Sequence, residues 1–136
     1  MTKLPENEED VLNSTPPVIP PKRHGLPRLI AAARYSFAGF RAAFDSEEAF
    51  RLEVLCLIIL TPVALYFGQT SVEKILLIGV VLLLMVIELL NTAVEAVVDR
   101  IGSEYHELSR QAKDIGSAAV FIGMVLVAMV WGLILL

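Results

Sequence analysis

The stretch ILLIGVVLLLMVIELLNTAVEAVVD, residues 75–99, decides the fold and raises the functional question. Residues 75–87 carry no formal charge, as in a segment that crosses a bilayer, whereas three carboxylates and an asparagine follow in 88–99. A carboxylate facing acyl chains costs on the order of 2.5 to 3.5 kcal/mol at the bilayer centre on insertion scales. The polar residues that end this segment must therefore face protein, water or a cation.

Two further apolar segments flank this one. The 136 residues are 56% hydrophobic, with a mean hydropathy of +0.68, which is too apolar for an ordinary soluble fold of one domain. A bilayer core of roughly 30 Å needs about 20 helical residues. We therefore expect membrane spans at about 48–67, 73–98 and 114–136. The single cysteine, Cys56, excludes a disulfide within the chain and is expected to be a buried thiol of the first span.

The segment before the first span predicts a different kind of helix. Apolar residues recur at intervals of three and four between 28 and 45, with arginines on another face, which is typical of an amphipathic helix lying on a membrane surface. Asp45 followed by Glu48 resembles a capping signature for the next helix. Residues 1–25 are acidic and proline-rich and are expected to be a disordered tail.

The predicted fold class is thus an all-α membrane protein, in which a surface helix precedes three transmembrane helices within a domain at 26–136. Ten of the eleven Lys and Arg residues lie before or within the first span or in the 100–114 loop, and only Lys74 lies in the loop between the first two spans. The positive-inside rule then predicts a multi-pass protein of a cytoplasmic membrane, with its N-terminus in the cytoplasm and its C-terminus outside.

The polar residues of the central segment share one face. Glu88, Asn91, Glu95 and Asp99 are spaced by 3, 4 and 4, so a helix places them along one stripe. Three helices offer little interior for such a stripe, which predicts that protomers associate and bury it. Small residues that would permit close contact between helices are the pairs Ala119 with Gly123 and Ala128 with Gly132.

Three functions fit the stripe. Its residues could act only as polar contacts between helices, or Glu88 could be the titrating site of an oligomeric proton- or cation-conducting protein. The third hypothesis is a catalytic site at the membrane surface, in which Glu88 meets a lipid while shallower carboxylates hold a metal and a soluble cosubstrate. Lys113 and Asp114, which begin the next helix, favour this third hypothesis. The chain contains no G-x-x-x-x-G-K-[ST] motif, which excludes a P-loop nucleotide site.

The residues also carry a resemblance to a known family. The motifs ELLNTAVEAVVDR (88–100), GSEYHELS (102–109) and AKDIGSAAV (112–120), with the three-helix layout behind them, resemble the bacterial membrane-integral diacylglycerol kinase family over roughly 28–136. This resemblance implies a homotrimer that transfers the γ-phosphate of MgATP to the hydroxyl of diacylglycerol and forms phosphatidic acid. Similar sequences phosphorylate undecaprenol, which stays open as an alternative acceptor.

The resemblance also implies roles for individual residues. Glu88 would accept the hydroxyl proton, with Asn91 orienting Glu88 or a phosphate oxygen, while Glu47 and Glu95 would hold Mg²⁺. Without the resemblance, Glu47 would be read as the i,i+4 ion-pair partner of Arg51. The residues expected to contact ATP are Arg28, Tyr35, Glu47, Glu95, Glu104, His106, Lys113 and Asp114. Those expected to contact the lipid substrate are Ala32, Ser36, Arg41, Phe44, Arg51, Glu53, Glu88 and Ser117. Asp99 either supports the residues that contact the substrates without touching a substrate itself, or is simply an exposed residue at the helix end.

Overall fold

A computed structural model describes residues 25–102 and 104–136. The predicted fold class is confirmed, since these residues form four helices and no strand. The first is α2, Leu26–Ser46, and three helices long and apolar enough to cross a membrane follow it: α3, Glu48–Phe67, α4, Ser71–Ile101, and α5, Glu107–Leu135. The predicted tail at 1–25 lies, except for Gly25, outside the described residues.

The chain divides at Ser36 into two units, which are described separately. The first contains the beginning of α2, where apolar side chains such as Leu29 and Ile30 are exposed. Within this unit the Ser36 hydroxyl donates to the Ala32 carbonyl at 3.1 Å. The second unit, from Phe37 onward, contains the end of α2 and the three long helices.

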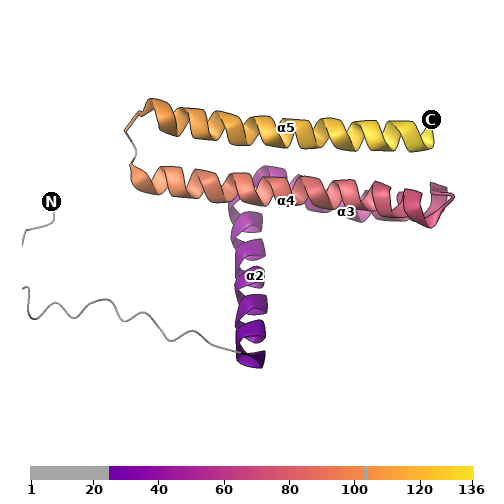
Figure 1. The fold of residues 1–136 in the computed structure, drawn as a ribbon, viewed down its shortest axis with the longest axis horizontal. Coiled ribbons are helices and arrows are strands. Elements are labelled where there is room, and N and C mark those ends of the chain that lie inside the picture. Colours follow the sequence, from indigo (N-terminus) through magenta and orange to yellow (C-terminus); the bar gives the residue numbers. More distant parts are fainter. Residues whose placement is uncertain (1–24, 103) are drawn as a thin grey trace, which may run out of the picture. The chain divides into compact units, whose positions relative to one another are not determined.

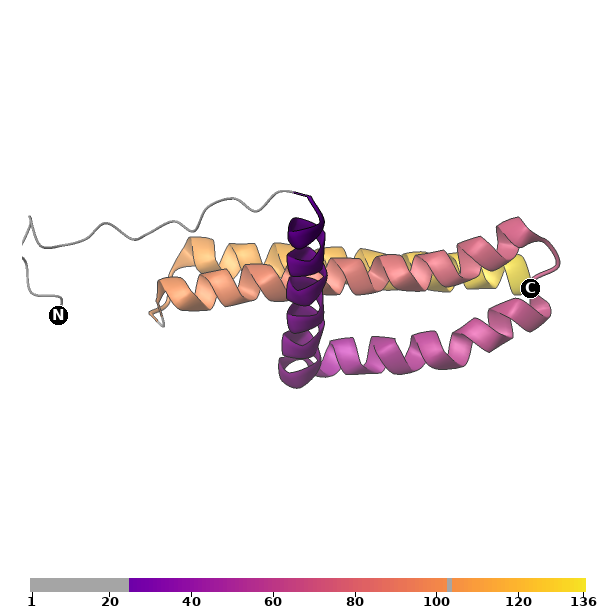
Figure 2. The same cartoon turned by 90° about the horizontal axis from the view of Figure 1, so that it is seen from below.

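Helix α4 is the centre of the second unit because it packs against both α3 and α5. Figures 1 and 2 show α3 and α5 running alongside it. Its buried apolar residues are Leu77, Val80, Val81 and Leu84, which recur at helical spacing on one face. Many other apolar side chains of the three helices are exposed, as expected of surfaces that meet lipid or another protein.

A buried glycine sets the contact between α4 and α5. An ideal Cβ built on Gly123 would lie 2.8 Å from the Leu84 Cδ1 and 3.3 Å from the Ile87 Cδ1. Gly123 therefore permits close approach of α5 to α4 within one chain, as predicted for close contact between helices. The Gly132 position, by contrast, has nothing within 4 Å of an ideal Cβ.

The junction between α2 and α3 differs from its prediction. Asp45 lies inside α2, where its carboxylate is 3.7 Å from the Arg41 Nε, and Glu47 is the N-cap of α3 without a side-chain hydrogen bond. Capping by Asp45 was wrong because the α2 backbone ladder continues to the Glu47 amide, which donates to the Ala43 carbonyl at 2.8 Å. The prediction that Cys56 is a buried thiol was also wrong, since its side chain is exposed on α3.

The other two helix starts are capped by side chains. At α4, the Thr70 hydroxyl accepts from the Glu73 amide at 3.2 Å while the Glu73 carboxylate accepts from the Thr70 amide, which is a capping box. At α5, the His106 Nδ1 accepts from the Leu108 amide at 3.2 Å. These caps fix where the connections on either side of α4 end.

The start of α4 and the end of α5 are joined by a hydrogen bond, in which the Trp131 Nε1 donates to the Leu77 carbonyl at 3.1 Å. We expect Trp131→Phe to lower the free energy of unfolding by roughly 0.6 to 1.7 kcal/mol, the range found for hydrogen bonds between helices in membranes. Titration with denaturing detergent in mixed micelles measures this change. Met129→Leu, a substitution at an exposed position on the same helix, is the control. Equal stability of both variants would contradict a role for the indole N–H.

Candidate active site along the polar stripe of α4

The polar stripe is the continuation of the face with which α4 packs. Glu88 follows the buried Leu84 by four residues and is itself only 5% exposed, the one buried charged side chain among the described residues. Asn91 and Glu95 are half-buried, and Asp99 is exposed. Burial thus decreases steadily along the stripe. The expectation that a single chain is too small to bury these residues was wrong for Glu88, because α3 and α5 flank α4.

Carboxylates from two helices surround Glu88. The charges of Glu47, at the start of α3, and of Glu95 both act on it, and the charge of Glu88 acts in turn on the half-buried Glu53 of α3. The Glu53 Oε2 is buried without a hydrogen-bond partner in the described part of the chain. Like charges in a poorly hydrated site repel each other, so these carboxylates concentrate negative charge around the buried Glu88.

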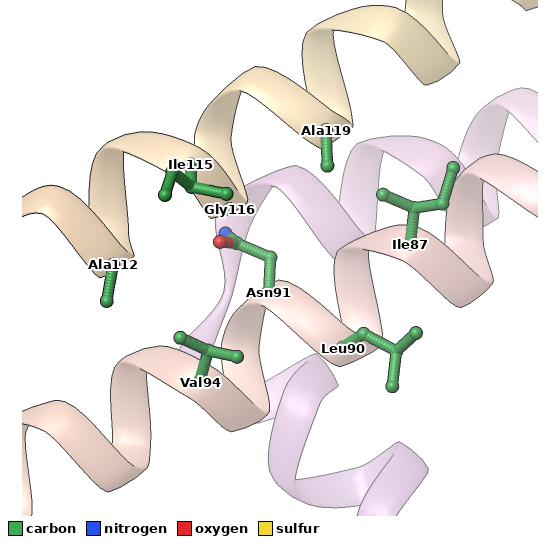
Figure 3. A pocket seen from close by; sticks show the side chains of 8 residues that line it. All are labelled: Ile87, Leu90, Asn91, Val94, Ala112, Ile115, Gly116 and Ala119. Carbon is green, nitrogen blue, oxygen red and sulfur yellow. The ribbon is translucent and has the colours of Figure 1, made fainter.

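Asn91 orients Glu95 rather than Glu88. Its Nδ2 donates to the Glu95 Oε1 at 3.0 Å, one turn further along α4. Its Oδ1 is buried, has no partner among residues 25–102 and 104–136, and lies against Gly116 of α5. Figure 3 shows the Asn91 amide directed across the helix interface at Gly116. In the described chain the Asn91 amide thus holds the Glu95 carboxylate, and its expected role at Glu88 or at a phosphate oxygen stays a prediction.

An open groove of about 510 Å³ lies beside this amide, between α4 and α5. Apart from Asn91, its lining is entirely apolar or glycine, as Figure 3 shows: Ile87, Leu90 and Val94 come from α4, and Ala112, Ile115, Gly116 and Ala119 from α5. The groove reaches the stripe at Asn91, and its lining residues are exposed or half-buried. The walls of this groove therefore present apolar surface next to the carboxylates of the α4 stripe.

Four of the residues expected at the nucleotide, Glu104, His106, Lys113 and Asp114, lie in or just after the connection between α4 and α5. The Lys113 ammonium is 2.5 Å from the Asp99 carboxylate of α4, and the Asp114 carboxylate accepts from Arg110 at 2.7 Å. Arg110 also pairs with Glu107 at 2.6 Å. Glu104 is exposed, and His106 caps α5. Asp99 is thus paired with Lys113, and its side chain is exposed near the end of α4.

The residues expected at the lipid are divided between the two units. Ala32 and Ser36, together with Arg28 and Tyr35 from the nucleotide set, belong to the first unit, and all four are exposed there. In the second unit, Arg41, Phe44, Arg51 and Ser117 are exposed, and Glu53 is half-buried. Arg51 donates to the Phe44 carbonyl at 3.0 Å rather than to the Glu47 carboxylate, so its ion-pair alternative was wrong. Arg51 thereby binds an otherwise free carbonyl at the end of α2.

Sequence reasoning missed two features of this site. Gly116 has no Cβ where the Asn91 amide crosses to α5, and Arg110 links Glu107 to Asp114. Arg110 could have been found, since it lies three and four residues from its partners. Gly116 gave a weaker signal, its seven-residue spacing from Gly123, which places both glycines on one face of α5.

Comparison with known proteins identifies relatives for most of the chain. The profile of a family described as Prokaryotic diacylglycerol kinase matches residues 34–135. The Diacylglycerol kinase of Haemophilus influenzae is 54% identical over 114 residues, which cover 84% of this chain and 97% of the relative. That of Escherichia coli K12 is 48% identical over 111 residues, with 82% and 91% covered. That of Pseudomonas aeruginosa is 48% identical over 112 residues, again with 82% and 91% covered.

Proposed function

The chain belongs to the prokaryotic diacylglycerol kinase family, and on that premise we propose that it transfers the γ-phosphate of MgATP to the free hydroxyl of diacylglycerol and forms phosphatidic acid. The observation that carries the proposal is Glu88, a nearly buried carboxylate on an otherwise apolar span. The ion-conducting and undecaprenol alternatives have no comparable support.

Glu88 is the proton acceptor in this proposal. Phosphoryl transfer requires an aligned nucleophile, neutralised charge on the phosphoryl oxygens and a group that receives the hydroxyl proton. A lipid alcohol is too weakly acidic to lose its proton first, so the proton passes to the Glu88 carboxylate as the new O–P bond forms and the bond from the γ-phosphorus to the ADP oxygen breaks. Its depth in the span suits a hydroxyl held just below the lipid headgroups, which ATP approaches from the water.

Glu47 and Glu95 fit a Mg²⁺ ion that arrives with ATP. Mg²⁺ is usually bound by one or two carboxylates together with substrate phosphates and waters. Within residues 25–102 and 104–136 no group of three or more Asp, Glu, His or Cys residues is arranged to hold a metal. Glu47 and Glu95 would therefore hold the ion together with oxygens of the bound ATP. The hydrogen bond from Asn91 orients the Glu95 carboxylate for this task. When bound, the ion neutralises negative charge on the phosphates.

The remaining contacts follow the family resemblance. Lys113 contacts a phosphate, and Asp114 contacts the nucleoside or the metal. Further ATP contacts come from Arg28, Tyr35, Glu104 and His106, and the lipid is held by Ala32, Ser36, Arg41, Phe44, Arg51, Glu53 and Ser117. The protein acts as a homotrimer in the bacterial inner membrane, with its N-terminus in the cytoplasm and its C-terminus in the periplasm. The extensive exposed apolar surface of α3, α4 and α5 supports burial against lipid and neighbouring protomers.

Transfer of labelled γ-phosphate to defined lipids tests this function. Purified protein in mixed micelles receives labelled MgATP with short-chain diacylglycerol or, separately, with undecaprenol. We expect labelled phosphatidic acid and much less label on undecaprenol, with no product when Mg²⁺ is chelated. Label on undecaprenol alone would keep the chemistry and reject the proposed acceptor. If well-assembled protein labels neither lipid, the kinase function fails.

A further inference from the structure

The pair between Asp99 and Lys113 differs from the other ion pairs of the described residues. It joins α4 to α5, whereas Arg41 with Asp45, Arg110 with Glu107 and Arg110 with Asp114 are each three or four residues apart within one helix. Lys113 and Asp99 lie 2.5 Å apart although thirteen residues separate them in the sequence. Helix packing therefore brings this pair together.

The pair fixes the direction of a flexible side chain. The Lys113 side chain is 40% exposed, and its four-carbon stem samples many rotamers unless its end is held. Because the Asp99 side chain is 65% exposed, the pair contributes little to stability. What it changes is the position of the ammonium, which it holds against the α4 stripe instead of leaving it free in solvent.

The position of the ammonium suits binding of phosphate. An ammonium has three N–H donors, and Asp99 engages it from one side, which leaves donors for a phosphate oxygen. The charge of Glu95, one turn before Asp99, also acts on this ammonium. Asp99, which holds Lys113, lies one turn from Glu95 on the stripe of α4, so the ammonium is kept on the side of α4 that carries the residue we assign to Mg²⁺.

Given the kinase function above, on which this inference rests, we propose that Asp99 is a positioning residue that holds the Lys113 ammonium toward the phosphates of ATP. Asp99 itself touches neither ATP nor the lipid. Its own negative charge opposes the approach of phosphate, so its benefit acts only through Lys113. A double-mutant cycle isolates such an indirect role.

The test measures KM for MgATP, kcat with saturating diacylglycerol, and the Kd of an ATP analogue whose β–γ bridge is a methylene group. Asp99→Ala is expected to raise both KM and Kd on the order of tenfold while kcat changes less. Asp99→Glu, which retains a carboxylate, restores most of the affinity. In the Lys113→Ala background, Asp99→Ala has no further effect. Asp45→Ala, which removes an acid from another exposed ion pair, leaves KM for MgATP unchanged.

Three results would overturn the proposal. An equal loss of affinity in the Lys113→Ala background would mean that Asp99 acts independently of Lys113. A lower KM in Asp99→Ala would mean that Asp99 competes with phosphate for the ammonium. Unchanged affinity in Asp99→Ala would mean that Lys113 needs no partner. Because the analogue binds without transfer, the cycle in Kd still decides the role of Asp99 if the wild-type protein labels no diacylglycerol, a result that rejects the kinase function by itself.

Discussion

Glu88→Gln is expected to lower kcat for phosphate transfer to diacylglycerol by about 10² to 10⁴, the contribution typical of a positioned general base. The amide has nearly the volume of the carboxylate, so packing at this buried position changes little. It cannot accept the hydroxyl proton, because an amide nitrogen carries no basic lone pair. The measurement is the initial rate of labelled phosphatidic acid formation at saturating MgATP and lipid. KM for MgATP is expected to stay within a fewfold of the wild-type value.

Glu73→Gln is the matched control for this variant. It makes the same chemical change on the same helix, but at the capping box, where the amide oxygen can still accept from the backbone. We expect full activity and unchanged assembly. Substantial transfer by Glu88→Gln, with Glu73→Gln also active, would reject Glu88 as the proton acceptor. Loss of assembly in Glu88→Gln, seen by size-exclusion chromatography, would instead indicate a structural role.

Gly116→Ala is expected to reduce activity strongly through Asn91. The added Cβ would overlap the Asn91 Oδ1, so the amide must move and its hydrogen bond to Glu95 is lost. Overpacking of this kind costs roughly 1 to 3 kcal/mol of stability. Because Glu95 then loses its orientation, the concentration of Mg²⁺ needed for half-maximal rate is expected to rise at least about tenfold, as for residues that orient metal ligands. A Mg²⁺ titration of the rate, alongside thermal unfolding, separates the two effects.

Gly79→Ala provides the corresponding control. An ideal Cβ on Gly79 has nothing within 4 Å, and alanine favours a helix over glycine by about 1 kcal/mol, so this variant is expected to be active and at least as stable as wild type. Asn91→Ala combined with Gly116→Ala tests the connection. If the glycine acts through Asn91, removal of the amide relieves the overlap, and the double variant is no worse than Asn91→Ala alone. An additive loss would contradict this mechanism.

Local sequence patterns were sufficient for the helices and for the stripe. Hydrophobic length and helical periodicity depend on neighbouring residues, so three apolar helices and the common face of Glu88, Asn91 and Glu95 follow from the sequence alone. The motifs that begin with ELLNTAVEAVVDR resemble those of the family, and this resemblance predicted phosphate transfer from MgATP to a lipid. The residue at which α3 begins could not be predicted from the sequence, because both Asp45 and Glu47 are acceptable next to a helix start. The backbone hydrogen bonds of α2, which continue to Glu47, decide between them.

Contacts between helices required the tertiary structure. The sequence places Asp99 and Lys113 near the ends of two helices, but only the rotation and axial offset of α5 against α4 bring their charged groups together. The same offset places Gly116 opposite Asn91 and Gly123 opposite Leu84. These offsets result from close packing summed over both helices, to which no single residue contributes a decisive local signal. The sequence by itself therefore determined which residues share a face, and the packing of α3 and α5 on α4 decided that Glu88 is buried and which side chains meet across the helices.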